Sequence, residues 1–306
     1  MSSSVTQFKY GNVEQPSPFN IEDISAYTSW RQWKLDNYPE KVSSLVIPVN
    51  NPACLTPEEK DRILRQCEKT NTVIYHCQKT VNEKQVIRSL GQQLGLNHLD
   101  ENLCSDEDGI SGLQVMAEGS RHEGYIPYTD KPINWHTDGY YNTRQQKIKA
   151  MILHCVSDSA VGGENAILDH EIVYIIMRDH DPEMVQALMQ ADVMTIPENK
   201  ENGVVIRPAQ TGPVFSIDEN SGHLHMRYTA RKRSIEWKQD EATLKAVAFL
   251  EKLLNSENKY IFHYRLQPGE GIISNNALHN RTGFKDDDEN GKNRLIYRAR
   301  YFDRVQ

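Results

Sequence analysis

A histidine and an aspartate stand two positions apart in "INWHTDGYYN", residues 133–142. On a β-strand this spacing places His136 and Asp138 on the same face, because successive side chains alternate between faces. One imidazole and one carboxylate can then reach a common metal ion. A third ligand, usually a second histidine far along the chain, would complete one face of an octahedral site and leave other positions open. Taken alone, the pair is more typical of a polar turn.

The C-terminal region adds a histidine and two arginines. In "GEGIISNNALHNRTGF", residues 269–284, a glycine turn and a buried strand lead to an exposed polar His279. In "NRLIYRARYF", residues 293–302, period-two alternation sends Arg294, Ile296 and Arg298 to one side of a strand. Two arginines beside an isoleucine are costly to bury unless anions meet them. A dicarboxylate co-substrate would supply one such anion.

Other histidines compete for a metal. His223 and His225 in "HLHMRY" also share a face of an expected strand and could form a cupin-like site. No second motif follows them at a distance that suits a cupin arrangement. Tyr140 and Asn134 flank the first pair, where they either line a substrate pocket or only pack.

The elements that must position these residues are mostly short strands joined by turns. "LTPEEKDRILRQCEKT" (55–70) predicts a helix with Thr56 as N-cap and a capping box closed by Glu59. Residues 82–95 predict a second helix, and 171–190 two short helices broken near Asp181. Residues 240–256 predict another helix, with Leu244, Val247, Ala248 and Leu254 on one face. Strands are expected at 43–49, 112–119, 147–158, 162–170, 203–208, 212–217, 223–230, 259–267, 269–276 and 294–302.

This order favours a β-sandwich or barrel decorated with helices over a doubly wound parallel sheet, which would need regular alternation and a glycine-rich phosphate turn. With 306 residues and 38% hydrophobic content, one large domain is the better expectation. We assign residues 46–306 to that domain. Residues 1–45, polar and irregular, form an N-terminal extension packed on or near it.

Charge and cysteine content exclude several classes of protein. A formal charge of −7 with no basic block beyond "ARKR" at 230–233 argues against nucleic acid as a partner. No apolar run approaches the ~18 residues that span a bilayer, and the N-terminus lacks the regions of a signal peptide. Five cysteines form no Cys-x-x-Cys pair, which fits reduced thiols and a cytoplasmic location.

Four motifs together resemble a known family. "WHTDG", "GGENAILDH", "NNALHNRTGF" and "NRLIYRARYF" are similar, in order and separation, to segments of the Fe(II)/2-oxoglutarate dioxygenases of the taurine dioxygenase (TauD/TfdA) family, which includes the γ-butyrobetaine hydroxylase group. The resemblance covers about residues 110–303. It implies a mainly β fold with helices: a distorted double-stranded β-helix, or jelly roll, with helical insertions and the metal at its open end.

The resemblance also implies a role for each matching residue. His136, Asp138 and His279 match the iron ligands, and Arg294 matches the arginine that pairs with the distal carboxylate of 2-oxoglutarate, a task that suits a planar guanidinium. Asn165 stands where the family often has a threonine that contacts this carboxylate. The loop between His279 and Arg294 is longer than in taurine dioxygenase and carries the acidic insert "DDDENGK".

We therefore expect a dioxygenase that uses Fe(II), 2-oxoglutarate and O2 to hydroxylate or desaturate a small substrate, releasing succinate and CO2. Arg298 matches the arginine that meets the substrate's sulfonate in taurine dioxygenase, so the expected substrate is acidic or amino-acid-like and carries a carboxylate or sulfonate. Another interpretation is that Arg298 pairs with Asp288 or Glu289 of the insert. The alternative function is a cupin-type metal-binding jelly roll, an isomerase or binding protein, that does not use 2-oxoglutarate. The sequence leaves the oligomeric state open.

Overall fold

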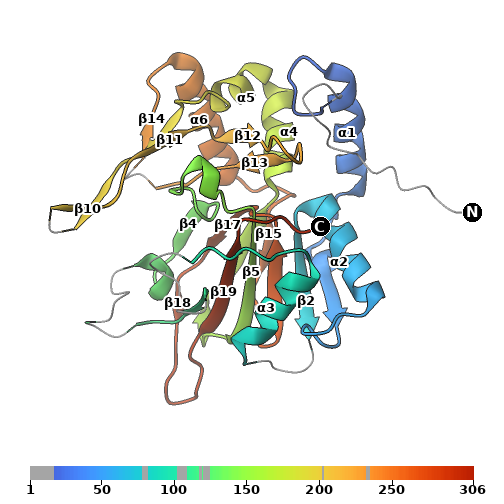
Figure 1. The fold of residues 1–306 in the computed structure, drawn as a ribbon, viewed down its shortest axis with the longest axis vertical. Helices are drawn as coiled ribbons and strands as arrows, with labels where there is room; N and C mark the ends of the chain where they lie inside the picture. The colour runs from blue at the N-terminus through green and yellow to red at the C-terminus, as the bar shows by residue number, and fades with distance from the viewer. Residues whose placement is uncertain are drawn as a thin grey trace, which may run out of the picture.

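Two sheets form the centre of the molecule (Figure 1). The computed structural model describes residues 17–77, 82–101, 109–116, 119, 125–201, 203–231 and 235–306. The larger sheet has six strands in the order β1-β2-β16-β5-β19-β3. Its strands are β1 (Val46–Val49), β2 (Thr72–Cys77), β3 (Ile110–Leu113), β5 (Ala150–Ser157), β16 (Glu270–Ser274) and β19 (Leu295–Tyr301).

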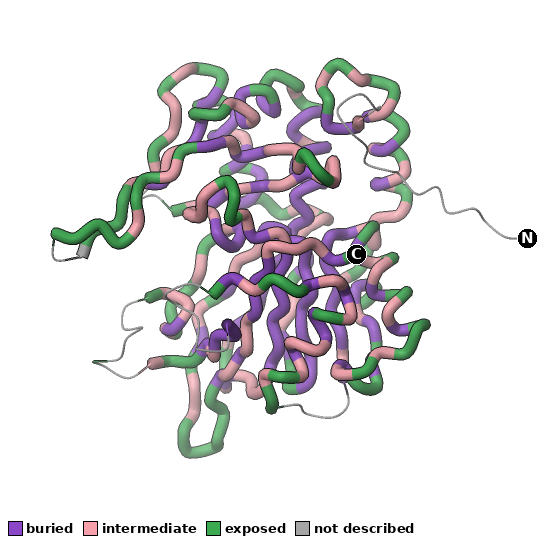
Figure 2. The backbone as a smooth tube through the Cα atoms, viewed as in Figure 1, coloured by how far each residue is buried: buried purple, intermediate pink, exposed green. Residues whose placement is uncertain are grey.

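Both faces of the six-stranded sheet are covered. On β5, Ala150 and Ile152 point to one face, where helices α2 (Pro57–Thr70) and α3 (Lys84–Gln93) pack. Met151 and Leu153 point to the other face, toward the second sheet. A strand with two buried faces is apolar along its whole length, which explains the continuous apolar run in the sequence. Figure 2 shows these strands as largely buried.

The second sheet has four strands in the order β15-β7-β17-β4. These are β15 (Phe262–Tyr264), β7 (Asn165–Leu168), β17 (Leu278–Arg281) and β4 (Ile133–His136). β17 runs antiparallel to both of its neighbours and places His279 directly opposite His136. The sheet therefore brings together two histidines that lie far apart in the chain.

A helical layer lies at one end of the molecule (Figure 1). It contains α4 (His170–His180), α5 (Pro182–Leu188) and α6 (Glu241–Leu254), with the break between α4 and α5 at Asp181 as predicted. Asp181 both ends α4 and accepts a hydrogen bond from the Glu183 amide at the start of α5.

The first 45 residues are not irregular throughout, so that prediction was wrong. Residues 24–37 form helix α1 (Ile24–Asn37), whose Trp30 is fully buried in the core beside α4. Lys34 is also fully buried, where its ammonium lies 2.7 Å from the Asp169 carboxylate and 2.5 Å from that of Glu171. The helix was missed because the mean hydropathy of the segment is low and the buried Lys34 interrupts the apolar pattern from which a buried helix face is predicted. Residues 1–16 lie outside the described part.

The predicted face of α6 was partly wrong: Val247 and Leu254 are buried as predicted, but Leu244 and Ala248 are not. Leu244 is 42% exposed and Ala248 is exposed, whereas Ala246, Leu250 and Leu253 are buried. The helix is rotated about its axis relative to the prediction, because the face with Thr243, Ala246 and Leu250 packs on α4 and α5. The apolar residues of this segment cover more than one face, so the period alone did not determine which face is buried.

The other elements are short. The predicted strand at 112–119 lies earlier, at β3, and part of that range is outside the described residues. Within the described residues, no helix is long and apolar enough to cross a bilayer. The remaining strands are β6 (Val161–Gly162), β8 (Met194–Ile196), β9 (Asn199–Glu201), β10 (Val204–Arg207), β11 (Gln210–Gly212), β12 (Phe215–Ile217), β13 (Leu224–Met226), β14 (Glu236–Trp237) and β18 (Phe284–Lys285), and the 3₁₀ turns are η1 (Val42–Leu45), η2 (Ile126–Tyr128) and η3 (Arg144–Gln146).

Candidate active site

The structure brings His136, Asp138 and His279 to one point. The two imidazole rings face each other across β4 and β17 with centroids 4.2 Å apart, and His136 Nε2 lies 3.8 Å from Asp138 Oδ1. One ligand atom from each residue lies within 4.8 Å of the others. The sequence analysis explained the approach of His136 and Asp138 by a shared strand face, and the structure gives a different reason. β4 ends at His136, and Asp138 stands at the start of a turn that curves back toward His279.

Each ring is held by a backbone carbonyl. His136 Nδ1 lies 2.9 Å from the carbonyl oxygen of Asn134, and His279 Nδ1 lies 3.0 Å from that of Ala277. A carbonyl can only accept a hydrogen bond, so Nδ1 must carry the proton in both rings. The lone pair is then on Nε2 of each imidazole, which is the tautomer that binds a metal through Nε2.

Asn276 clamps the turn that carries Asp138. Its Oδ1 accepts from the Asp138 amide at 2.7 Å, and its Nδ2 donates to the carbonyls of Asp138 at 2.9 Å and Ile148 at 2.7 Å. Asn276 itself adopts a left-handed backbone with φ of 56°, which asparagine tolerates better than most residues. The turn is thereby joined to the strand that carries His279.

Electrostatics prepare the three side chains for a cation. Burial lowers the pKa of His136 to about 3, helped by its neighbour His279, and burial also lowers the pKa of His279. Burial alone would raise the pKa of Asp138, but Arg298 and Arg300 outweigh it and hold the pKa below its ordinary value. At neutral pH the group is two neutral imidazoles and one carboxylate, the forms that bind metals.

The donor set fits a divalent transition metal. Asp138 Oδ2 is buried and has no hydrogen-bond partner among the described residues, so one carboxylate oxygen is free to ligate. Two imidazoles and one carboxylate on one side of an ion are the donors of the non-haem iron facial triad. In the part of the chain that the structure describes, no other group of three histidine, cysteine or acidic side chains converges in this way. His223 and His225 take no part in such a group.

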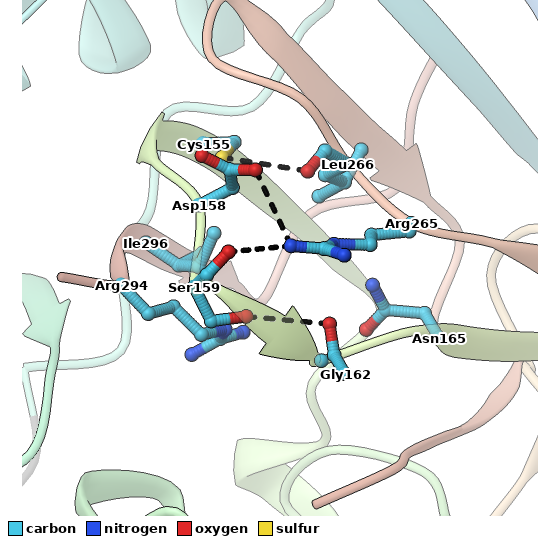
Figure 3. Close-up of a pocket in the computed structure, with 10 residues that line it drawn as sticks. Cys155, Asp158, Ser159, Gly162, Asn165, Arg265, Leu266, Arg294 and Ile296 are labelled. Carbon is cyan, nitrogen blue, oxygen red and sulfur yellow. Dashed lines mark hydrogen bonds and ion pairs between the residues drawn. The ribbon is translucent and has the colours of Figure 1, made fainter. Parts of the chain in front are cut away.

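Arg294 and Asn165 line a small pocket (Figure 3). Arg294 is buried, and its Nη1 has no hydrogen-bond partner among the described residues. Burial lowers the pKa of Arg294 to about 10, so the guanidinium still carries its charge at neutral pH. The cavity has a volume of about 10 Å³, room for about one water molecule. Asp158 also lines this cavity, but its carboxylate pairs with Arg265 and Lys292, and Arg294 has no ion pair within the described residues. A buried cation is costly unless an anion meets it.

The pocket depends on two glycines of the "GGEN" turn. Gly162 and Gly163 have φ of 78° and 75°, a conformation that side chains disfavour. A Cβ on Gly162 would lie 2.2 Å from the carbonyl oxygen of Gly283, which leaves no room for any other residue. The turn therefore lines the pocket beside Arg294, since a Cβ on Gly163 would lie 3.6 Å from Arg294 Nε, and it presents Asn165 at the start of β7.

Arg298 does not pair with the acidic insert. Its Nη1 lies 3.8 Å from Asp138 Oδ1, and its buried Nε has no hydrogen-bond partner among the described residues. The pairing with Asp288 or Glu289 considered from the sequence was therefore wrong. Arg298 shares the inward face of β19 with Arg294, since Ile296 between them packs in the core between the two sheets.

Two residues near the site, Arg300 and Asp100, were missed by the sequence analysis. Arg300 continues the inward face of β19 and lies 2.6 Å from Asp100 and 3.0 Å from the Tyr141 hydroxyl. The alternation of arginines could have indicated Arg300. Nothing in the sequence indicates Asp100, which lies in an irregular segment 200 positions away. Arg281 is also buried, and its guanidinium stacks on Phe284 at 4.7 Å, with Arg294 over the same ring at 5.1 Å.

The two flanking residues differ in exposure. The Asn134 side chain is exposed at the edge of the second sheet, on the same face of β4 as His136. Tyr140 is partly buried, and its ring packs edge-on against that of Tyr141 with centroids 5.1 Å apart. Its carbonyl accepts a hydrogen bond from Arg227 at 2.7 Å.

Comparison with known proteins identifies the family. The profile of the taurine catabolism dioxygenase TauD, TfdA family matches residues 41–300. The chain belongs to this family. A uridine-5'-phosphate dioxygenase of an Amycolatopsis species is 28% identical to this chain over 176 residues, which is 54% of this chain and 59% of that protein. Trimethyllysine dioxygenase of Meyerozyma guilliermondii is 26% identical over 164 residues, 51% of this chain and 40% of the relative. The chain therefore matches only about half the length of these relatives.

Solved structures share the fold. The non-heme iron oxygenase OrfP in complex with Fe and alpha-ketoglutaric acid has a TM-score of 0.59 and 14% identity, covering 82% of this chain and 81% of that one. Asparagine oxygenase in complex with Fe(II), 3-hydroxyasparagine and succinate has a TM-score of 0.56 and 14% identity, covering 80% and 78%. The arrangement of several sheets with helices is thus the arrangement of these oxygenases.

Proposed function

We propose that this protein is an Fe(II)- and 2-oxoglutarate-dependent dioxygenase in which His136, Asp138 and His279 hold the iron. The observation that carries the proposal is the convergence of these three side chains beside a strand that also carries the unpaired, buried Arg294. A metal-binding protein that does not use 2-oxoglutarate has no need for that cation. Membership of the TauD, TfdA family supports the same function.

The fold that suits this function is a jelly roll. In our proposal, the six-stranded and four-stranded sheets are its two walls, and the metal ligands lie at the end where β4 and β17 open toward the helical layer. The shared core between the sheets, which includes Leu153, Ile167 and Ile272, supports this arrangement. Residues 46–306 would form this single domain, with the segment before residue 46 attached through α1.

Each polar residue of the site would have a separate task. Arg294 would bind the distal carboxylate of 2-oxoglutarate through its free Nη1, and Asn165 would donate a second hydrogen bond from its amide. Asn276 would hold Asp138 in place, and the Asn134 and Ala277 carbonyls would orient the two imidazoles. Bound iron supplies oxygen activation coupled to the conversion of 2-oxoglutarate into succinate and CO2. The products expected from the primary substrate are hydroxylated or desaturated.

The primary substrate, we infer, carries an acidic group that binds near Arg298. Arg294 and Arg298 are four residues apart on one face, about 13 Å at roughly 3.3 Å per residue, so one small co-substrate does not occupy both. Arg298 has an unpaired Nε and a long contact of 3.8 Å to Asp138, which leaves donors for a second anion. One relative is named for uridine-5'-phosphate, a substrate with an anionic group. Asn134 and Tyr140 would line the same pocket.

Succinate release tests this function. The purified protein with Fe(II), 2-oxoglutarate and O2 should release succinate slowly alone and faster with an acidic compound from a panel of small amino acids, sulfonates, betaines, carboxylates and phosphate esters. The stimulation should disappear in Arg298→Ala. Absence of succinate under all conditions, with folded iron-loaded protein, would contradict the proposal. The cytoplasmic location and the lack of a nucleic-acid partner stay predictions from the sequence.

A further inference from the structure

Arg300 links the metal site to a tyrosine at its edge. Arg300 is buried on the inward face of β19, two residues beyond Arg298. Its Nη2 pairs with Asp100 at 2.6 Å, and Asp100 is held in turn by its own amide, which donates to the Arg300 carbonyl at 2.8 Å. The other terminal nitrogen, Nη1, donates to the Tyr141 hydroxyl at 3.0 Å. The guanidinium is therefore fixed on two sides.

The direction of the Arg300 to Tyr141 hydrogen bond leaves a proton free. A guanidinium has donors and no acceptor, so the Tyr141 oxygen must accept in this bond. The phenolic proton of Tyr141 then points elsewhere, and no described residue accepts it. A phenol whose oxygen already accepts from a cation is a stronger donor, because hydrogen bonds in series polarise one another.

The surroundings of Tyr141 favour a negative partner for this proton. Arg207, at the end of β10, lies over the Tyr141 ring at 5.8 Å and bonds only to backbone carbonyls among the described residues. Arg298 lies two residues before Arg300 on the same face of β19, about 6.6 Å away at roughly 3.3 Å per residue. The Nε of Arg298 has no hydrogen-bond partner among the described residues. The two carboxylates that act on Arg300 are already engaged, because Asp100 pairs with Arg300 and Asp138 belongs to the group with His136 and His279.

We propose that Tyr141 is a substrate-binding residue whose phenolic proton, directed by Arg300, donates to the anionic group that Arg298 holds. This inference rests on the proposed function, because it assumes that the acidic substrate binds beside the metal. Asp100 and Arg300 act as positioning residues: they contact no substrate and fix the direction in which Tyr141 donates. The chemistry required of the ligand is a carboxylate, sulfonate or phosphate, with oxygens that can bridge a guanidinium and a phenol.

Sulfate binding, measured by calorimetry on the full chain, tests the proposal without turnover. The protein is first loaded with Fe(II) and saturated with 2-oxoglutarate without oxygen, so that the Arg294 pocket is filled before sulfate is added. The Tyr141→Phe variant removes one hydroxyl and keeps the ring. Tyr297→Phe is the matched control, since Tyr297 lies on the same strand but its hydroxyl donates to the Asn82 carbonyl on the outer side.

The expected result is a sulfate dissociation constant raised about tenfold by Tyr141→Phe, equivalent to ~1.4 kcal/mol, and unchanged by Tyr297→Phe. Arg298→Ala should raise it further. Equal sulfate affinity in Tyr141→Phe and the wild type, or no sulfate binding to the wild type, would overturn the role of Tyr141. If wild-type protein forms no Fe(II)–2-oxoglutarate complex in the loading step, the proposed function itself fails, and the two failures are thereby distinguished.

Discussion

Both imidazoles of the proposed metal site are oriented by the carbonyl two residues before them. His136 uses Asn134 and His279 uses Ala277, so each strand fixes the ring of its own histidine. Such outer contacts determine the tautomer and the ring direction, and they hold the ligands ready before the metal binds. Asp138 has no strand to hold it and relies on Asn276.

Replacing His136, Asp138 or His279 by alanine should remove metal binding. Each change deletes one donor, and loss of outer contacts alone already lowers metal affinity by about 10- to 100-fold, so a greater loss is expected here. Calorimetric titration with Co(II) measures it. His263→Ala, an exposed histidine of β15, is the control. Wild-type affinity in any of the three variants would remove that residue from the metal site.

Asn276→Gly should weaken metal binding by roughly tenfold. Glycine accepts the left-handed backbone of this position, so the change removes the three side-chain hydrogen bonds without new strain. Asp138 would then keep its charge and lose its fixed place. Metal affinity unchanged from wild type would show that the Asn276 bonds are not needed to hold Asp138.

Arg294→Leu should raise the dissociation constant for 2-oxoglutarate. An unpaired carboxylate in this partly buried pocket would cost about 3 to 5 kcal/mol, the magnitude of a broken buried pair. Equilibrium binding to the anaerobic iron-loaded protein measures the change, and Arg65→Leu on the exposed face of α2 is the control. A shift of less than tenfold, ~1.4 kcal/mol, would mean that another cation binds the co-substrate.

At the scale of elements, α1 is joined to α4 by a buried ionic group. Lys34 of α1 pairs with Asp169, the N-cap of α4, and with Glu171 in its first turn. Asp169 also accepts from the side chain of Asn71, which follows α2. Residues near the start of the chain are therefore tied to the helix that follows β7, the strand that carries Asn165.

Lys34→Met should destabilise the protein by about 3 to 5 kcal/mol at neutral pH, because it leaves two carboxylates buried without their cation. Urea unfolding measures the free energy. Lys252→Met, at an exposed position of α6, should change it little. A loss below 1 kcal/mol in Lys34→Met would show that water reaches these carboxylates.

The cost of Lys34→Met should shrink in acid. Burial raises the pKa of Asp169, but Lys34 outweighs this and the folded pKa lies below the ordinary value. Asp169 therefore stabilises the wild type above the unfolded pKa of about 4, and this contribution is lost as the pH falls through the folded pKa. The variant loses no such contribution. The difference between the free energies of unfolding of the two proteins should shrink as the pH falls below about 4, and a constant difference across that range would contradict the assignment.

At the scale of the whole molecule, the sequence predicted what depends on local pattern. Capping residues predicted the start of α2, and the break at Asp181 predicted the division between α4 and α5. Alternation predicted which residues of β19 face inward. What depends on distant contacts was not predictable. Asp100 pairs with Arg300, which lies 200 positions later in the chain. Lys34 can be buried because two acidic side chains at the start of α4 pair with it, and no short stretch of sequence predicts either contact.

The proposed metal site was also predictable only in part. The residue types of His136, Asp138 and His279 and their motifs were evident in the sequence, while their convergence depends on the antiparallel register of β4 with β17. The turn after His136, and not strand alternation, directs Asp138 to the same point. The role of Asn276 could not be inferred, since it follows from a left-handed backbone and from contacts to Asp138 and Ile148, which are distant in the sequence.

The most direct test of the central claim is the absorption spectrum of the protein mixed with Fe(II) and 2-oxoglutarate without oxygen. If His136, Asp138 and His279 hold iron and Arg294 anchors the co-substrate, a weak visible charge-transfer band of the chelate should appear when both components are present. It should be lost in Asp138→Ala. Folded protein that binds Fe(II) but shows no such band at saturating 2-oxoglutarate would contradict the account.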